Sequence, residues 1–167
     1  MPELFSLPFD RLNEGEQFAT RGRTVTEADV VAFSSLTGDW HPQHTDAVWA
    51  ASSVFGERIA HGMLLLSFAV GLLPFDPERV LALRRVEDVV FKRPAFIGDT
   101  VHAAGRIDSL SPVDDRAGLV TLAWRMENQH GELLLRARTQ VLWAGDGARP
   151  SDDSPGLPLT AAGVLPL

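Results

Sequence analysis

The order of hydrophobic patterns along the chain predicts an α+β fold, in which an antiparallel sheet curves around one buried helix. Helix-like segments lie between Thr26 and Leu73, and strand-like segments rich in valine follow Pro77. The stretch MLLLSFAVGLLPF, which begins at Met63, is apolar on nearly every side and therefore indicates a helix enclosed by other structure. Helices followed by a run of strands are typical of α+β proteins.

The first elements expected are a strand and a capped helix. Residues 15–25 alternate loosely between polar and apolar side chains and predict a strand. Thr26 is a good helix cap, acidic residues follow it, and Gly38 can end the helix in the left-handed conformation. The apolar face of this helix is expected to consist of Val30, Phe33 and Leu36.

Two further helices are expected before the strands. The segment AVWAASSVF predicts a short helix that Thr45 or Asp46 caps and Gly56 ends. The apolar helix from Met63 to about Leu73 follows, and the prolines after it cannot continue a helix.

Four strands complete the expected domain. They are predicted at residues 80–91, 99–110, 118–127 and 132–143, and NQHG at residues 128–131 predicts a hairpin turn between the last two. Residues 1–143 are therefore expected to form a single domain. Residues 144–167 are rich in Gly, Pro, Asp and Ser, which predicts a tail that is extended or partly disordered.

Composition excludes several classes of function. The chain has 167 residues, no cysteine and a formal net charge of −7, so a thiolate nucleophile is impossible and nucleic acid is not the expected partner. The longest apolar run is shorter than the roughly 20 residues needed to span a bilayer. No signal peptide is expected from the first residues, and a cytoplasmic location without membrane partners follows as the prediction.

The stretch GDWHPQHTD, residues 38–46, places carboxylates and imidazoles between two helix-like segments. Asp39 and His44 are separated by a proline-containing loop that can turn both toward one cavity. Imidazole can move a proton near neutral pH, and a carboxylate can hold the same water. From the spacing alone, a solvated loop with a turn-forming aspartate explains these residues better.

A metal site in this stretch is the weaker alternative. Its ligands would come from Asp39, His41, His44 and Asp46. These positions match no familiar zinc or iron spacing, so no metal is predicted.

The segment IAHGM, residues 59–63, lies directly before the apolar helix. A glycine at a helix N-terminus presents free N–H groups at the positive end of the helix dipole. Gly62 could therefore bind an oxygen that gains negative charge during a reaction. The alternatives are a plain bend at Gly62, and a cap or a packed core histidine at His61.

Three segments together resemble the MaoC-like (R)-specific enoyl-CoA hydratases and dehydratases of the hotdog fold. They are DWHPQH (residues 39–44), AHGM (residues 60–63) and VVFKRPAFIGDTV (residues 89–101). The resemblance implies a hotdog fold, a homodimer or an assembly of dimers, and a lyase of fatty acid metabolism. It implies that Asp39 and His44 form the catalytic pair around a water. It assigns oxyanion and substrate binding to Gly62, His61 and His41.

The implied reaction is hydration of a trans-2-enoyl-CoA to a 3-hydroxyacyl-CoA, or the reverse dehydration, without a metal or redox cofactor. One departure from the family motif is His41, which stands where the motif has asparagine. Lys92 and Arg93 are candidates for contact with the coenzyme A phosphates, and a solvated strand end explains them equally well. Candidates for the acyl pocket are Val54, Phe55, Leu64 and Phe68, although ordinary core explains each of them better.

Two other functions remain compatible with the sequence. A thioesterase on the same fold would hydrolyse the thioester instead of hydrating the alkene. A non-catalytic acyl-CoA-binding protein or partner subunit would bind the thioester without turnover.

Overall fold

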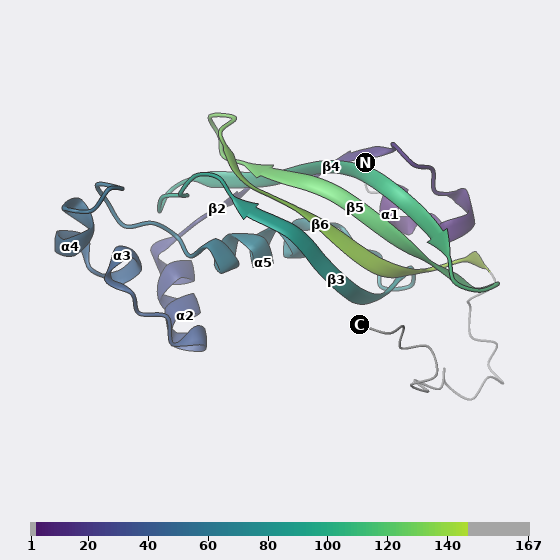
Figure 1. Cartoon of the computed structure of the whole chain (residues 1–167), viewed down its shortest axis with the longest axis horizontal. Helices are drawn as coiled ribbons and strands as arrows, with labels where there is room; N and C mark the ends of the chain where they lie inside the picture. The colour runs from purple at the N-terminus through teal and green to yellow at the C-terminus, as the bar shows by residue number, and fades with distance from the viewer. Residues whose placement is uncertain (1–2, 147–167) are drawn as a thin grey trace.

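The computed structural model describes residues 3–146 and contains a curved antiparallel sheet that packs on one main helix (Figure 1). Two short elements, α1 (Glu3–Ser6) and the 3-10 turn η1 (Phe9–Arg11), precede the expected ones. The helices that follow are α2 (Glu27–Thr37), α3 (Pro42–Thr45), α4 (Ala47–Ala51) and α5 (Gly62–Leu72). The strands are β1 (Gln17–Ala19), β2 (Arg23–Thr24), β3 (Val80–Phe91), β4 (Thr100–Pro112), β5 (Ala117–Glu127) and β6 (Leu133–Ala144).

The strands lie in the order β1-β4-β5-β6-β3, all antiparallel, and β2 also pairs with β4. This arrangement around α5 confirms the predicted α+β hotdog fold. The four strands predicted after Pro77 are present, and the turn between β5 and β6 is where NQHG predicted it. The predicted domain boundary at residue 143 is not tested, and the predicted tail lies almost entirely outside the described residues.

The single strand expected at residues 15–25 is wrong, because two short strands occupy this stretch. Thr20 lies between them, and its backbone N–H still donates to Ala103 O at 2.8 Å. Its hydroxyl, rather than its backbone, accepts from Ala103 N at 2.9 Å. The side chain thus replaces the next backbone bond of the ladder, so pairing with β4 breaks and resumes only at β2.

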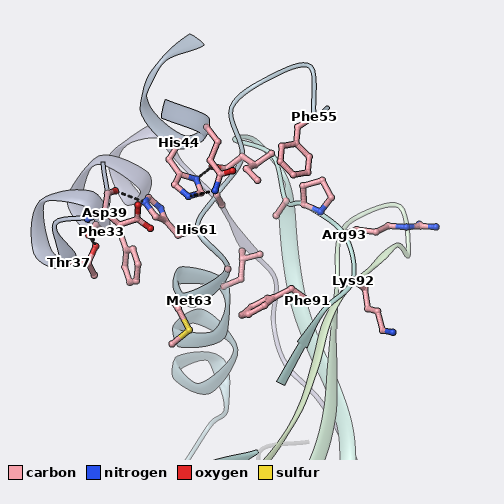
Figure 2. Close-up of a pocket in the computed structure, with 17 residues that line it drawn as sticks. Phe33, Thr37, Asp39, His44, Phe55, His61, Met63, Phe91, Lys92 and Arg93 are labelled. Atoms are coloured by element: carbon pink, nitrogen blue, oxygen red, sulfur yellow. Dashed lines mark hydrogen bonds between the residues drawn. The ribbon is translucent and has the colours of Figure 1, made fainter. Parts of the chain in front are cut away.

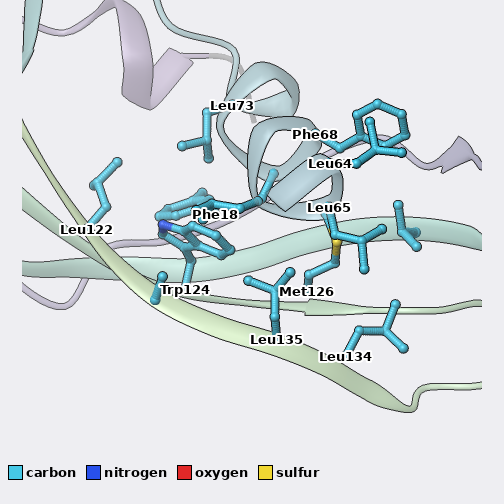
Figure 3. Packing of buried hydrophobic residues seen from close by; sticks show 14 of the residues in the cluster. Phe18, Leu64, Leu65, Phe68, Leu73, Leu122, Trp124, Met126, Leu134 and Leu135 are labelled. Atoms are coloured by element: carbon cyan, nitrogen blue, oxygen red, sulfur yellow. The ribbon is translucent and has the colours of Figure 1, made fainter. Parts of the chain in front are cut away.

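Helix α5 forms the centre of the core. Its apolar side chains face the inner surface of the sheet, and Leu65 lies close to Met126 and Leu135 (Figure 3). Burial of each such leucine or phenylalanine stabilises the fold by about 1.5–3 kcal/mol. The side chains of α5 that are at most 9% exposed are Leu64, Leu65, Leu66, Phe68 and Ala69.

Helix α2 begins and ends as its sequence predicts, but its buried face differs. Thr26 and Asp29 form a reciprocal capping box, and Gly38 ends the helix at φ 78°. Leu36, expected on the apolar face, is 83% exposed. Val30 is buried as predicted, and Ser34 is buried although it was not expected to be, because the helix contacts the rest of the protein through the narrow side that faces His61.

Residues 39–58 form a lobe, the α3–α4 lobe, that projects beyond the end of the sheet (Figure 1). Asp46 caps α4 by accepting from the N–H groups of Val48 and Trp49, both at 2.9 Å, which resolves the choice between Thr45 and Asp46. A backbone hydrogen bond and an ion pair are among the contacts that join the lobe to its surroundings. Ile59 N donates to Gln43 O at 3.1 Å, and Arg58 pairs with Glu27 of α2.

No helix within residues 3–146 is long and apolar enough to cross a bilayer. The cytoplasmic location stays a prediction.

Gly105 is the position at which the sheet should tolerate a side chain least. A Cβ there would lie 2.7 Å from Trp124 Cβ and closer still to the backbone oxygen of Ala123. Neither neighbour is the flexible end of a side chain, so the Gly105→Ala variant should lower the free energy of unfolding by about 1–3 kcal/mol or more. Urea unfolding followed by circular dichroism measures this loss.

Gly71→Ala is the matched control for this variant. An added Cβ at Gly71 would meet nothing within 4 Å, and the residue lies in α5. Alanine should therefore stabilise the helix slightly. Equal unfolding midpoints for the two variants would contradict the close approach at Gly105.

Candidate active site

A cavity of about 680 Å³ opens between the α3–α4 lobe, the start of α5 and the end of β3 (Figure 2). Asp39, His44 and His61 lie on one side of it, and Phe55 and Phe91 lie on the other. The lining residues are Phe33, Thr37, Asp39, Gln43, His44, Phe55, Ile59, Ala60, His61, Gly62, Met63, Leu65, Phe91, Lys92, Arg93, Pro94 and Ala95. The three segments that carry the family resemblance therefore meet at one cavity.

His44 is oriented as a neutral base. Its Nδ1 lies 2.7 Å from the backbone oxygen of Ile59, and because a carbonyl only accepts, Nδ1 carries the hydrogen. The unprotonated atom of the neutral ring is then Nε2. The side chain is 3% exposed, and this burial lowers the pKa of His44 below its usual 6.5. The Ile59 bond and the Asp39 charge oppose that effect, while His61 and His41 add to it.

Asp39 lies just after the left-handed Gly38 that ends α2, so the chain turns its carboxylate toward the cavity. One carboxylate oxygen accepts from the His41 N–H at 3.2 Å, and Asp39 remains exposed. An atom of this carboxylate, one of His44 and one of His61 all lie within 4.8 Å of one another. A carboxylate and a neutral imidazole at this separation can share one water between them.

His61 occupies the cap position of α5 but does not cap the helix. Its Nε2 instead lies 3.1 Å from Asp39 O and 3.2 Å from Ser34 Oγ. The His61 ring also stacks on His44, with centroids 3.7 Å apart. One side chain therefore fixes the positions of both members of the proposed pair.

The N-terminus of α5 faces the cavity with unused donors. The first N–H groups of a helix have no partner within it, and within residues 3–146 no acceptor meets the N–H of Gly62. A Cβ on Gly62 would lie 2.9 Å from the Phe91 ring, so glycine also allows Phe91 to pack against the helix start. The site thus has a helix end with free donors opposite a histidine that can accept a proton.

The same cluster has some features of a metal site. Its three potential ligands, Asp39, His44 and His61, are close enough to share one ion. However, both ring nitrogens of His44 already have hydrogen-bond partners. The lone pairs of imidazole lie in the ring plane, and the two stacked rings direct theirs side by side rather than to one point. This geometry favours hydrogen bonding, and the absence of a metal stays a prediction.

His41 lies next to the cavity rather than in its wall. Its Nδ1 accepts from Gln43 N at 3.2 Å and so caps α3. Asparagine is a preferred cap residue, so His41 performs the capping role for which the family motif's asparagine is suited. Substrate contact by His41 stays a prediction.

Lys92 and Arg93 line the cavity at the end of β3 and are exposed. Arg93 pairs with Glu132 at 3.1 Å, whereas no carboxylate within residues 3–146 pairs with Lys92. Their contact with a substrate stays a prediction.

Of the four acyl-pocket candidates, only Phe55 lines the cavity. Leu64 and Phe68 belong to the core beneath the sheet, and Val54 is 94% exposed on the α3–α4 lobe. Leu64 and Phe68 are therefore ordinary core, the reading that the sequence favoured, whereas Val54 belongs to neither the cavity nor the core. The apolar wall is formed instead by Phe33, Met63, Leu65 and Phe91, with Phe55.

Three residues in or beside the site were not predicted. Gln43 contacts His44, Ser34 contacts His61, and the Ile59 carbonyl fixes the ring of His44. A buried serine in the middle of an amphipathic helix is a weak signal that it has a polar partner. No sequence signal distinguishes the other two.

Comparison with known proteins identifies relatives of the whole domain. The (R)-specific enoyl-CoA hydratase of Aeromonas caviae is 34% identical over 125 residues, which cover 75% of this chain and 91% of that protein. Protein MaoC of Klebsiella aerogenes is 42% identical over 95 residues, but these span only 28% of that protein's length.

A solved structure described as a monoamine oxidase regulatory protein from Archaeoglobus fulgius matches with a TM-score of 0.78 and 38% identity. The match covers 83% of this chain and 95% of that one. The family description "MaoC like domain" matches residues 11–123, more than half of the chain and all three motif segments. The chain therefore belongs to the MaoC-like domain family, whose hotdog fold it shares.

Proposed function

We propose that the protein hydrates trans-2-enoyl-CoA thioesters to (R)-3-hydroxyacyl-CoA, or catalyses the reverse dehydration. The observation that carries this proposal is the position of a neutral imidazole beside a carboxylate, facing the free N–H groups of a helix across one cavity. The name of the Aeromonas caviae relative supports the same reaction class.

Each part of the site has a role in the proposed reaction. Asp39 holds a water, and His44 Nε2 takes one of its protons as the oxygen forms a bond to C3 of the enoyl group. The electron pair of the alkene moves toward the thioester carbonyl, whose oxygen gains negative charge. The N–H of Gly62 stabilises that oxygen. Return of the proton from His44 to C2 completes the addition, without a metal or redox cofactor.

The shape of the cavity supports an acyl thioester as substrate. Phe55, Met63 and Phe91 offer an apolar wall for the acyl chain, and the exposed Lys92 and Arg93 lie at the β3 side. Two cations there can attract the phosphates of coenzyme A despite the acidic chain.

We also infer that the protein is a homodimer or an assembly of dimers. Strand β3 is at the edge of the sheet, and within residues 3–146 no strand pairs with its outer side. Leu81 and Leu83 on this strand are 42% and 52% exposed. A long edge strand of this kind is usually covered. Sedimentation velocity should give a species at least twice the 18.2 kDa mass of the chain; a monomer at micromolar concentration would contradict the inference.

The proposed activity can be tested with crotonyl-CoA. Loss of the enoyl absorbance without release of free thiol is the expected result, and chiral analysis should identify the (R) product. Free thiol would instead identify a thioesterase. Saturable binding without either change would identify an acyl-CoA-binding protein.

The pH dependence follows from the state of His44. Hydration needs the unprotonated ring, and burial lowers the pKa of His44 below 6.5. A lowered pKa keeps the base form present at lower pH, so the midpoint of the acid limb of the kcat/KM profile should lie below pH 6.5. Initial rates between about pH 5 and pH 8 measure this midpoint. A midpoint above pH 6.5 would contradict a neutral buried base.

A further inference from the structure

The side chain of Gln43 directly contacts the proposed base. Its amide Nε2 lies 3.0 Å from His44 Nε2, and both residues line the cavity. Because Nδ1 of His44 carries its hydrogen toward Ile59 O, the Nε2 atom of the neutral ring can only accept. In this contact the Gln43 amide N–H therefore donates to the lone pair of His44 Nε2. The proposed reaction requires the same lone pair to take a proton from water.

The backbone of Gln43 is fixed at both of its polar groups. Its N–H donates to His41 Nδ1 at 3.2 Å, and its carbonyl accepts from Ile59 N at 3.1 Å. Ile59 is the residue whose carbonyl orients His44. Hydrogen bonds to the two backbone groups of Ile59 thus position both the base and the amide that meets it.

The oxygen of the same amide has no partner within residues 3–146. When His44 is neutral, the amide nitrogen donates to Nε2. Once Nε2 carries a proton, two donors would face each other, so the amide has to turn. Its free oxygen can then accept from the same ring atom, which means that glutamine can pair with both protonation states of the ring.

We propose that Gln43 is a positioning residue for His44, which holds Nε2 unprotonated in the resting site and turns its amide aside so that the lone pair can take the proton of water. The turn of the amide during proton transfer rests on the proposed function. The hydrogen bond to the neutral ring does not depend on any reaction. No other side chain within residues 3–146 hydrogen-bonds to His44.

Histidine ring nitrogens can be observed directly in the protein without substrate. Two-bond proton–nitrogen spectra of the ¹⁵N-labelled full chain should contain five imidazoles, and a His44→Gln variant assigns the His44 signals. In the unsubstituted protein at neutral pH, His44 should be the neutral form with hydrogen on Nδ1. The spectra recorded over a pH series give its titration midpoint.

Two substitutions of Gln43 separate the possible roles of its amide. Gln43→Met keeps the length of the side chain but removes the donor, so the His44 midpoint should rise by roughly half a pH unit. Gln43→Glu keeps the shape but can only accept, so the midpoint should rise by about one unit or more. Asp39, His61 and His41 are the other titratable groups that act on His44, and they are unchanged in both variants.

His130 provides an internal control in the same spectra. It accepts from Gln129 at 3.1 Å at the exposed turn between β5 and β6, with the same order of residue types as Gln43 and His44. Its midpoint should not move in either Gln43 variant. A general change in the fold would move it or the other three imidazoles as well.

We expect the His44 titration midpoint to be lowest in the unsubstituted protein, higher in Gln43→Met and highest in Gln43→Glu. The acid limb of the kcat/KM profile should move in the same order. Equal midpoints in the unsubstituted protein and Gln43→Met would overturn the proposal. If the midpoints follow the order but no protein hydrates enoyl-CoA, the contact with His44 stands and the proposed function fails. If hydration occurs and the midpoints are equal, the function stands and the role of Gln43 fails.

Discussion

Replacing His44 with alanine should lower kcat for crotonyl-CoA hydration by roughly 10²–10⁴-fold. Once Nδ1 donates to Ile59 O, Nε2 is the ring atom left to take a proton, and the ring lies with the Asp39 carboxylate in the wall of the cavity. Water alone cannot replace a positioned base of suitable pKa. The measurement is the initial rate at saturating crotonyl-CoA, with thermal unfolding recorded for the same sample.

Two companion variants make this result specific. His44→Gln preserves much of the buried volume but cannot take a proton, so it should be as inactive as alanine. His130→Ala removes an exposed histidine from a turn remote in sequence and should leave kcat unchanged. Full activity in a folded His44→Gln protein would show that another group is the base.

Asp39→Asn should lower kcat as well, because an amide can hold water but carries no charge that stabilises the imidazolium as it forms. The Asp39 charge raises the pKa of His44, so the asparagine variant should also shift the acid limb to lower pH. A loss of kcat without a shift of the acid limb of the pH profile would indicate a purely structural effect.

Replacing Gly62 with proline should cost roughly 10²–10³-fold in kcat. Proline removes only the N–H that is proposed to bind the thioester oxygen, and it is favoured at the first position of a helix. His61 already has the extended conformation that a residue before proline adopts, at φ −63° and ψ 136°. The start of α5 should therefore survive the change while its first donor is lost.

Gly62→Ala controls for the added bulk. Its Cβ would meet the Phe91 ring at 2.9 Å, and this half-exposed ring can shift, while the N–H remains. The alanine variant should raise KM and keep most of kcat, because the ring lines the cavity. Equal losses of kcat in the two variants would assign the effect to crowding rather than to the lost donor.

The start and end of α2 and the start of α4 were predictable because their signals are local, whereas the expected end of α4 at Gly56 is wrong, since the helix ends at Ala51. Thr26 and Gly38 delimit α2 through contacts within a few residues, and Asp46 caps α4 in the same way. The buried face of α2 could not be predicted in the same way, because burial depends on what lies beside the helix. Leu36 satisfies the helical period, yet nothing in the described structure covers it.

The residues of the candidate site also fall into those with a local sequence signal and those whose contacts depend on packing. Asp39, His44 and Gly62 could be proposed from short motifs, since each lies in a local segment with a recognisable pattern. Ser34 and His61 meet across 27 residues, and the contact depends on how α2 docks beside α5. The single strand expected at residues 15–25 failed because one threonine hydroxyl replaced a backbone bond.

The attachment of the α3–α4 lobe has a consequence for how the protein loses activity. The lobe carries Asp39 and His44. Its link to α2 through Arg58 and Glu27 is a partly exposed ion pair, which contributes at most about 1 kcal/mol, and its other attachments include a few hydrogen bonds to Ile59 and His61. The sheet is held by continuous ladders and a packed core. The lobe should therefore behave as a separate cooperative unit with lower protection against hydrogen exchange. Inactivation by mild denaturant would then reflect opening of this unit, while the sheet stays folded.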